Sequence, residues 1–253
     1  DNWDNGDGAP SIEIEFGGVQ IASVPMGTQA ESTLDTDGWW PVHIEVTTDG
    51  DVTVIYNGET IHDQVNVPDF SPIENAQIAF GGRTGGANAN QWIDNFRYTI
   101  KSFTPDSETL EWDFNDGLPE GSEVAGVSEY SEDEGVDGSG ALVLTRNLGG
   151  QLGGWLSGPL GTVGRIILDF DIYIDDGTAT QADGVSMAIS DDLEPVTAFG
   201  EGGRGLGLRV NFDNWSNNDG APSIEIEYGG ERIATVPMGT QAESTLDTDG
   251  WWP

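Results

Sequence analysis

The chain has 253 residues and a formal net charge of −37, from 45 acidic and 8 basic residues. This charge argues against nucleic acid and anionic membranes as partners, because both would repel it. The sequence has no cysteine for disulfides or thiolate chemistry, and its two histidines are too few for most zinc sites. It also has no apolar run of the ~20 residues that a membrane span needs. A strongly acidic chain is typical of a saline or calcium-rich extracellular setting, where cations relieve self-repulsion.

Short apolar or alternating segments follow one another along the whole chain, and no convincing amphipathic helix interrupts them. The turns TDGD (48–51) and YNGE (56–59) carry the Asp-Gly and Asn-Gly pairs of β-hairpins. This pattern predicts an antiparallel β-sandwich or barrel. The clearest predicted strands are SIEIEFGG (11–18), HIEVTTDGDVTVIYNGETI (43–61, with its turns), ALVLT (141–145), RIILDFDIYIDD (165–176) and GVSMAI (184–189).

The two ends of the sequence are near-copies of each other. Residues 1–41 align with residues 213–253 without a gap, and 35 of the 41 positions are identical. The offset of 212 residues is the size of a whole domain, which predicts a tandem array of domains. The polar stretch at 103–107, which contains Pro105, is the predicted linker. Residues 1–102 would then be the C-terminal part of one unit and 108–253 the N-terminal part of the next.

Oxygen-bearing residues recur at every second position around a tryptophan in the second copy. Calcium takes six to eight oxygen ligands, and a tryptophan could contribute only its backbone carbonyl. An EF-hand is excluded because Ile224 stands where the loop's final glutamate belongs. The spacing is equally compatible with an Asx-rich turn that satisfies its own backbone. The candidate ligands are Asp213, Trp215, Asn217 and Asp219, with Asp1, Trp3, Asn5 and Asp7 as their counterparts in the first copy.

Four stretches, in order around one unit, resemble the L-type (legume-like) lectins. GLGLRVNFDNWSNND (205–219) is similar to their metal-binding stretch, and QADGVSMAI (181–189) to their first sugar-binding loop. FGEGGRGLGL (199–208) resembles their glycine-rich loop, and IAFGGRTGGANANQWIDNFRYTI (78–100) their closing strands. The last stretch and LEWDFNDGLP (110–119) also resemble bacterial laminin-G-like domains. The resemblance implies an all-β, antiparallel concanavalin A-like jelly-roll sandwich.

The resemblance also implies a sugar site beside the calcium. Asp183, after a cis peptide bond, would accept hydrogen bonds from two sugar hydroxyls, and Gly203 or its neighbour Gly202 would donate a backbone N–H. Asn217 would serve both metal and sugar, and the Trp215 ring could stack on a sugar face. The variable loop 84–90 would tune which sugar fits, with Arg83 and Asn88 as its candidate contacts.

Two departures from the lectin pattern matter. Asn211 stands where those lectins carry a glutamate for a second, transition metal, so we expect calcium alone. The loop 84–90 also precedes its partner loops in the chain. It would come from the next unit of the array, or from residues 42–102 folding back across the linker. The second route would leave 1–41 or 213–253 unpaired and able to complete a neighbouring unit by strand exchange.

Two acidic stretches could suggest a glycoside hydrolase, which needs two carboxylates on either side of the scissile bond. The EIE triplets at 13–15 and 225–227 are expected to be solvated faces of amphipathic strands. DFDIYIDD (169–176) is expected to be an alternating strand that ends in an acidic turn, with a second cation site as the alternative. The Glu-x-Asp-x-x-Glu pattern of the related hydrolases is missing from the sequence. We therefore expect no enzyme.

The function expected from the sequence is a calcium-dependent carbohydrate-binding module, repeated in a large extracellular adhesin or matrix protein at the cell surface. Linked weak sugar sites would gain by avidity. The alternative is a structural spacer or filament-forming repeat that calcium stiffens without sugar binding. Asp183 discriminates between them, because a spacer has no use for an aspartate at the sugar position.

Overall fold

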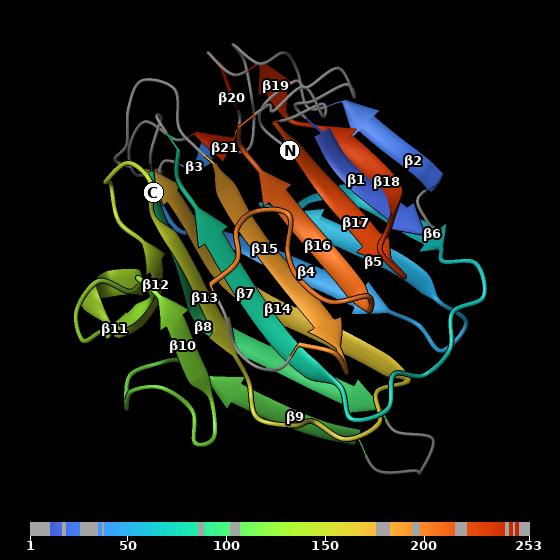
Figure 1. Cartoon of the computed structure of the whole chain (residues 1–253), viewed down its shortest axis with the longest axis horizontal. Coiled ribbons are helices and arrows are strands. Elements are labelled where there is room, and N and C mark those ends of the chain that lie inside the picture. The colour runs from blue at the N-terminus through green and yellow to red at the C-terminus, as the bar shows by residue number, and fades with distance from the viewer. Residues whose placement is uncertain are drawn as a thin grey trace.

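The computed structural model describes residues 11–16, 19–25, 35–36, 38–85, 89–101, 107–175, 183–193, 198–215, 222–240, 243–244 and 246–247. These residues form an all-β structure in which two large antiparallel sheets face each other as a sandwich (Figure 1). The prediction of an all-β antiparallel sandwich is therefore confirmed at this level. No helix among these residues is long and apolar enough to cross a membrane.

The first sheet has nine strands. Its antiparallel pairing is regular except that one strand also lies parallel to a second neighbour. In spatial order the strands are β10 (Glu123–Gly126), β13 (Leu152–Leu156), β7 (Gln77–Arg83), β15 (Gly184–Ser190), β16 (Leu208–Asp213), β17 (Ser223–Tyr228), β18 (Glu231–Pro237), β1 (Ser11–Phe16) and β2 (Val19–Pro25).

The second sheet has eight strands, of which seven form a continuous series. In spatial order these are β11 (Glu129–Ser131), β12 (Ala141–Thr145), β8 (Asn90–Lys101), β14 (Arg165–Asp175), β4 (Trp40–Val46), β5 (Asp51–Tyr56) and β6 (Glu59–Asn66), and β9 (Ser107–Trp112) pairs with β8. Two short pairs, β19 (Gly239–Thr240) with β20 (Glu243–Ser244) and β21 (Leu246–Asp247) with β3 (Asp35–Thr36), and a 3₁₀ turn at Val136–Gly138 complete the described elements.

Strands from the two sides of the predicted linker at 103–107 alternate in both sheets. β7 lies between β13 and β15, and β8 lies between β12 and β14, so neither side forms a sheet of its own. The N-terminal strands β4 to β8 thus complete the same sandwich as the later strands. Of the two routes considered for residues 42–102, this chain follows the one that folds back across 103–107.

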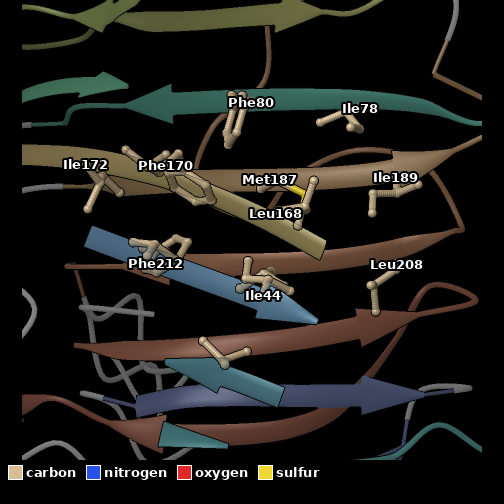
Figure 2. Close-up of a cluster of buried hydrophobic side chains, with 14 of the residues drawn as sticks. Ile44, Ile78, Phe80, Leu168, Phe170, Ile172, Met187, Ile189, Leu208 and Phe212 are labelled. Carbon is tan, nitrogen blue, oxygen red and sulfur yellow. The ribbon is translucent and has the colours of Figure 1, made fainter. Parts of the chain in front are cut away.

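The core lies between the two sheets and follows from the alternation of apolar residues in the strands. Figure 2 shows Ile44, Leu168 and Phe170 of the eight-stranded sheet beside Phe80 and Met187 of the nine-stranded sheet. Phe80 packs edge-on against Phe170, with ring centroids 5.1 Å apart. At β5–β6, Asn57 and Gly58 both have positive φ (48° and 78°), as the predicted Asn-Gly hairpin turn requires.

The outer face of the nine-stranded sheet is covered by the segment 198–207, which connects to β16 and runs in front of the sheet in Figure 1. Phe199 packs with Ala79, Leu156, Ala188 and Leu193 in a second, smaller apolar cluster. A Cβ atom on Gly81 would lie 2.2 Å from the Phe199 ring, so the close approach of this cover requires glycine there.

The repeated sequence forms two hairpins at one side of the nine-stranded sheet. β17–β18 belongs to the core, with Ile224, Ile226 and Val236 fully buried. β1–β2 continues the sheet beyond β18. β1 also lies parallel to β17, where Ser11, Ile12 and Phe16 align with Ser223, Ile224 and Tyr228. Each of these pairs joins positions exactly one repeat, 212 residues, apart.

Candidate functional site

Four charged residues meet at one end of the nine-stranded sheet. Arg83 ends β7, Asp183 precedes β15, Asp213 ends β16, and Glu201 comes from the covering segment 198–207. All three carboxylates are buried, and Asp183 is only 1% exposed. The sequence thus brings three acids and one arginine to the point where adjacent strands end.

Backbone contacts fix the position of Asp183. Its N–H donates to the carbonyl of Arg83 (2.5 Å), and its own carbonyl accepts from the N–H of Asn214 (2.6 Å). The next residue, Gly184, pairs with Asp213 in the ladder between β15 and β16. Gly184 has φ of 154°, and a Cβ atom there would lie 2.3 Å from the Phe212 carbonyl. The glycine therefore lets these strand ends approach closely.

Arg83 connects two of the carboxylates. Its Nε lies 3.0 Å from Asp183 Oδ2, and its Nη1 donates to Glu201 Oε1 at 3.1 Å. The Arg83 side chain is 47% exposed, whereas the side chains of Asp183 and Glu201 are almost completely buried. Two glycines make room for this arrangement. A Cβ on Gly85 would lie 3.1 Å from Asp183 Oδ1, and one on Gly200 would lie 2.7 Å from Arg83 Cβ.

Burial makes the charged forms of these acids costly. It raises the pKa of Asp183 to about 7, with a further rise from the negative charge of Glu201, and the Arg83 guanidinium opposes the shift. Burial likewise raises the pKa of Glu201, against Arg83, and raises the pKa of Asp213 well above its usual value. These raised pKa values favour the protonated, neutral acids, and a bound cation would favour their ionised forms.

The structure describes only part of the predicted calcium set. Asp213 and Trp215 lie at the end of β16, and the N–H of Trp215 donates to Asp213 Oδ1 at 3.0 Å, as in the Asx-turn alternative. Within the described ranges, no three His, Cys, Asp or Glu side chains come together as metal ligands. Asp176 of the stretch DFDIYIDD (169–176) lies outside those ranges. The other predicted ligands, Asn217, Asp219, Asp1, Trp3, Asn5 and Asp7, lie outside the described residues.

The predicted sugar-contacting residues are brought together in part. Arg83 and Asp183 are in direct contact, and the segment with Gly202 and Gly203 packs beside them. The N–H of Gly203 donates to the Gly200 carbonyl at 3.1 Å, which favours Gly202 as the donor to a ligand. Asn88, Asn217 and the peptide bond of Ala182 with Asp183 fall outside the described residues.

Sequence reasoning missed Glu201 and the buried polar pairs of β16 to β18. Asn211 Nδ2 donates to Glu227 Oε1 at 3.1 Å, and Arg209 forms an ion pair with Glu227. The expectation that 225–227 is a solvated face is wrong, because Glu225 and Glu227 are both buried. In the sequence, the burial of Glu201 could have been suspected from an acid inside a glycine-rich loop. The burial of the EIE triplet at 225–227 could have been suspected from the arginines at 209 and 232 on the neighbouring strands.

Comparison with known proteins does not name this site. The chain matches no protein-family model, and a search of curated proteins finds no match either.

Proposed function

We propose that the chain is a calcium-dependent carbohydrate-binding module without catalytic activity, built as a concanavalin A-like jelly roll and repeated in an extracellular or cell-surface adhesin or matrix protein. One observation carries the proposal. Three buried acids, Asp183, Glu201 and Asp213, gather at the loop end of the nine-stranded sheet, and Arg83 contacts the first two. Burial favours their neutral forms, and a bound cation would favour their ionised forms.

The proposed calcium is hard and prefers oxygen ligands, which is the donor type of this site. Asp213, the Trp215 carbonyl, Asn217 and Asp219 would hold it. Asp183 would accept hydroxyl hydrogens of the sugar, Gly202 would donate a backbone N–H, and Trp215 would offer an apolar ring face. For Asp183 to reach a sugar, the contact between Arg83 and Asp183 must open, and calcium supplies the replacement positive charge.

Glycan-array binding of the whole chain, with calcium and with a chelator, tests this proposal. We expect calcium-dependent binding that Asp183→Asn abolishes, because the substitution removes an acceptor for sugar hydroxyls. The exposed acid in Asp116→Asn is the matched control and should leave binding intact. Binding that survives the chelator and Asp183→Asn would place the sugar elsewhere on the molecule.

A structural role is the second candidate, and the burial of Asp183 against Arg83 favours it. In that case calcium would stiffen a spacer or filament repeat. Neighbouring units would associate by exchange of the repeated hairpin, since β1–β2 and β17–β18 present nearly the same sequence to one sheet edge. Calcium would then raise the melting temperature with no glycan bound. A strictly monomeric chain in light scattering at high concentration would contradict the exchange.

A further inference from the structure

The outer face of the eight-stranded sheet carries a second set of aromatic and polar side chains, on the sheet opposite to the strands of the Asp183 site. Three adjacent strands, β8, β14 and β4, contribute to it. On β14 the core residues Phe170, Ile172 and Ile174 are buried, while Asp171 and Tyr173 alternate with them and point outward, half-buried. Outward positions of the two flanking strands align with these residues in the ladder.

Three aromatic rings form a row across the three strands. Tyr173 of β14 stacks on Trp92 of β8, with centroids 4.7 Å apart and ring planes at 16°. Trp39, next to β4, lies 5.7 Å from the Tyr173 ring and 6.4 Å from the Trp92 ring. The indole N–H of Trp92 donates to the Thr145 carbonyl at 3.2 Å, which holds that ring in place. All three rings are half-buried, so each keeps apolar surface in contact with solvent.

A groove of about 320 Å³ is lined by Asp171, two residues before Tyr173 on β14, and by residues of the neighbouring strands. This volume lies at the lower end of the roughly 300–1,000 Å³ that small-ligand sites occupy. Polar side chains from all three strands line the groove, and apolar contacts from β4 and β5 border it. The polar lining residues are His43, Asn95, Arg97, Asp169 and Asp171.

The polar groups of the groove are held by contacts within the sheet. His43 Nδ1 lies 2.5 Å from Asp169 Oδ1, and Asn95 Nδ2 donates to Asp171 Oδ2 at 2.8 Å. The register between β8 and β14 shifts between Asp169 and Asp171, and Asn95 has positive φ (50°) at this bulge. Bulges of this kind re-aim side chains and are common beside functional sites.

The buried carboxylate of Asp94 holds the backbone of this bulge by hydrogen bonds. Its Oδ1 accepts the N–H of Asn95 at 2.6 Å, and its Oδ2 accepts from the Val136 N–H at 2.7 Å and the Ser139 hydroxyl at 2.9 Å. Three hydrogen bonds to one buried carboxylate fix the local backbone. Asn95 and Asp171 are therefore preorganised to face the groove rather than the core.

We propose that this face binds a neutral oligosaccharide, independently of calcium and of the Asp183 site. A sugar ring has an apolar C–H face, which packs on an aromatic ring, and a rim of hydroxyls, which hydrogen-bond to carboxylates and amides. The row of Trp39, Tyr173 and Trp92 supplies the first contact. Asp169, Asp171 and Asn95 supply the second.

Charge selects the class of sugar. Asp169 and Asp171 lie together in the groove, and its one arginine, Arg97, is already paired with Glu111, with Nε and Oε1 2.7 Å apart. An acidic sugar would be repelled by these carboxylates, whereas hydroxyl hydrogens of a neutral sugar find acceptors there. The groove is open along the sheet, which suits a chain of several sugar rings rather than a single enclosed ring.

Affinity electrophoresis of the whole chain tests this inference. The gels would contain hydroxyethyl cellulose, laminarin, xylan or dextran, with polygalacturonate as the acidic polymer, and a chelator would be present throughout. We expect at least one neutral polymer to retard the chain and polygalacturonate to have no effect. Trp39→Ala and Asp171→Ala should each raise the apparent Kd for that polymer about tenfold, because central contacts of an interface carry most of its binding energy. Asp183→Asn should not change it.

Leu206→Ala is the matched control, since Leu206 is an apolar side chain, 62% exposed, in the segment 198–207 on the opposite side of the sandwich. A titration of tryptophan fluorescence with the retarding polymer gives an independent readout, and its amplitude should fall in Trp39→Phe, with Trp92 supplying the rest. The inference is overturned if no neutral polymer retards the chain, or if retardation persists in both Trp39→Ala and Asp171→Ala. Retardation that requires calcium and vanishes in Asp183→Asn would also overturn it, while supporting the proposed function.

Discussion

The two outer faces of the sandwich start from the same kind of sequence and end in different environments. On the nine-stranded sheet, Glu225 and Glu227 alternate with core isoleucines, and both acids are buried. On the eight-stranded sheet, Asp169 and Asp171 alternate with core residues in the same way, and both acids line an open groove.

The difference comes from what lies above each sheet. The segment 198–207 covers β15 and β16, with Phe199 against Ala188 and Gly203 against Arg209 and Asn211. On the next strand, β17, Glu227 and Glu225 pair with the arginines at 209 and 232. Alternation along a strand thus determines which side chains point away from the core, and the groups packed on that face determine whether they are buried.

The largest expected effect comes from removing Arg83, the arginine that contacts Asp183 and Glu201. Arg83→Met leaves the buried carboxylates of Asp183 and Glu201 without their ion pair, and we expect the free energy of unfolding to fall by about 3 kcal/mol. The matched change on the open face is Arg97→Met, whose partner Glu111 is exposed, and it should cost less than about 1 kcal/mol. Urea denaturation of both variants measures the two values. Equal losses of unfolding free energy in Arg83→Met and Arg97→Met would contradict the difference in burial between the two faces.

The effect of burial on stability is tested at His62, a histidine that is buried in the sandwich. Burial lowers the pKa of His62 to about 3, against a backbone hydrogen bond at Ile224 that opposes the shift. The unfolded chain therefore binds more protons than the folded chain between pH 3 and about 6.5. The contribution of His62 to stability is complete above about pH 6.5 and is lost as the pH falls.

From pH 7.5 to pH 5.0 the wild-type chain should lose about 2 kcal/mol more stability than His62→Gln, at 1.36 kcal/mol per pH unit below about pH 6.5. Urea denaturation at both pH values gives this difference, and the titration of the carboxylates at the Asp183 site cancels in it. A pH slope in His62→Gln equal to that of the wild-type chain would contradict this role of His62.

The smallest expected effect uses a difference between the two sequence copies. Arg232 Nε lies 3.3 Å from Glu225 Oε2, and the first copy has Gln20 at the corresponding position. Arg232→Gln should cost about 1 kcal/mol, because Glu225 keeps its hydrogen bond from Ser223. Glu231→Val, a second change to the first copy's residue, should stay within about 0.5 kcal/mol. Thermal unfolding of both variants would show whether this order holds.

Much of the fold could be predicted from local sequence. Period-two alternation marked β5, β14 and β17 correctly, and the Asn57–Gly58 turn formed as expected because only residues tolerant of positive φ fit it. The cover at 198–207 could not be predicted from its own composition. Its burial rests on Gly81 and Arg83, which are far away in sequence and admit or contact it only in the folded state.

The candidate sites were predictable to different degrees. Arg83 and Asp183 were identified from family resemblance, and they do meet. Glu201 was missed because an acid in a glycine-rich loop reads as solvent-exposed until its arginine is known. The groove of Asp169 and Asp171 was missed because it needs β8, β14 and β4 side by side. These strands are far apart in sequence, and Asp169 of β14, for example, pairs with Arg97 of β8 and His43 of β4.

The alignment of β1 with β17 has a consequence for the kinetics and concentration dependence of assembly. A hairpin tethered to its own sheet competes for an edge at an effective concentration of about a millimolar, whatever the amount of protein in solution. A free molecule must exceed that value to displace it, so separate chains at micromolar concentration would stay closed. Units linked in one polypeptide escape this limit, because a neighbour's hairpin is tethered as well. Exchange would therefore be a first-order event within an array and a rare second-order event between arrays.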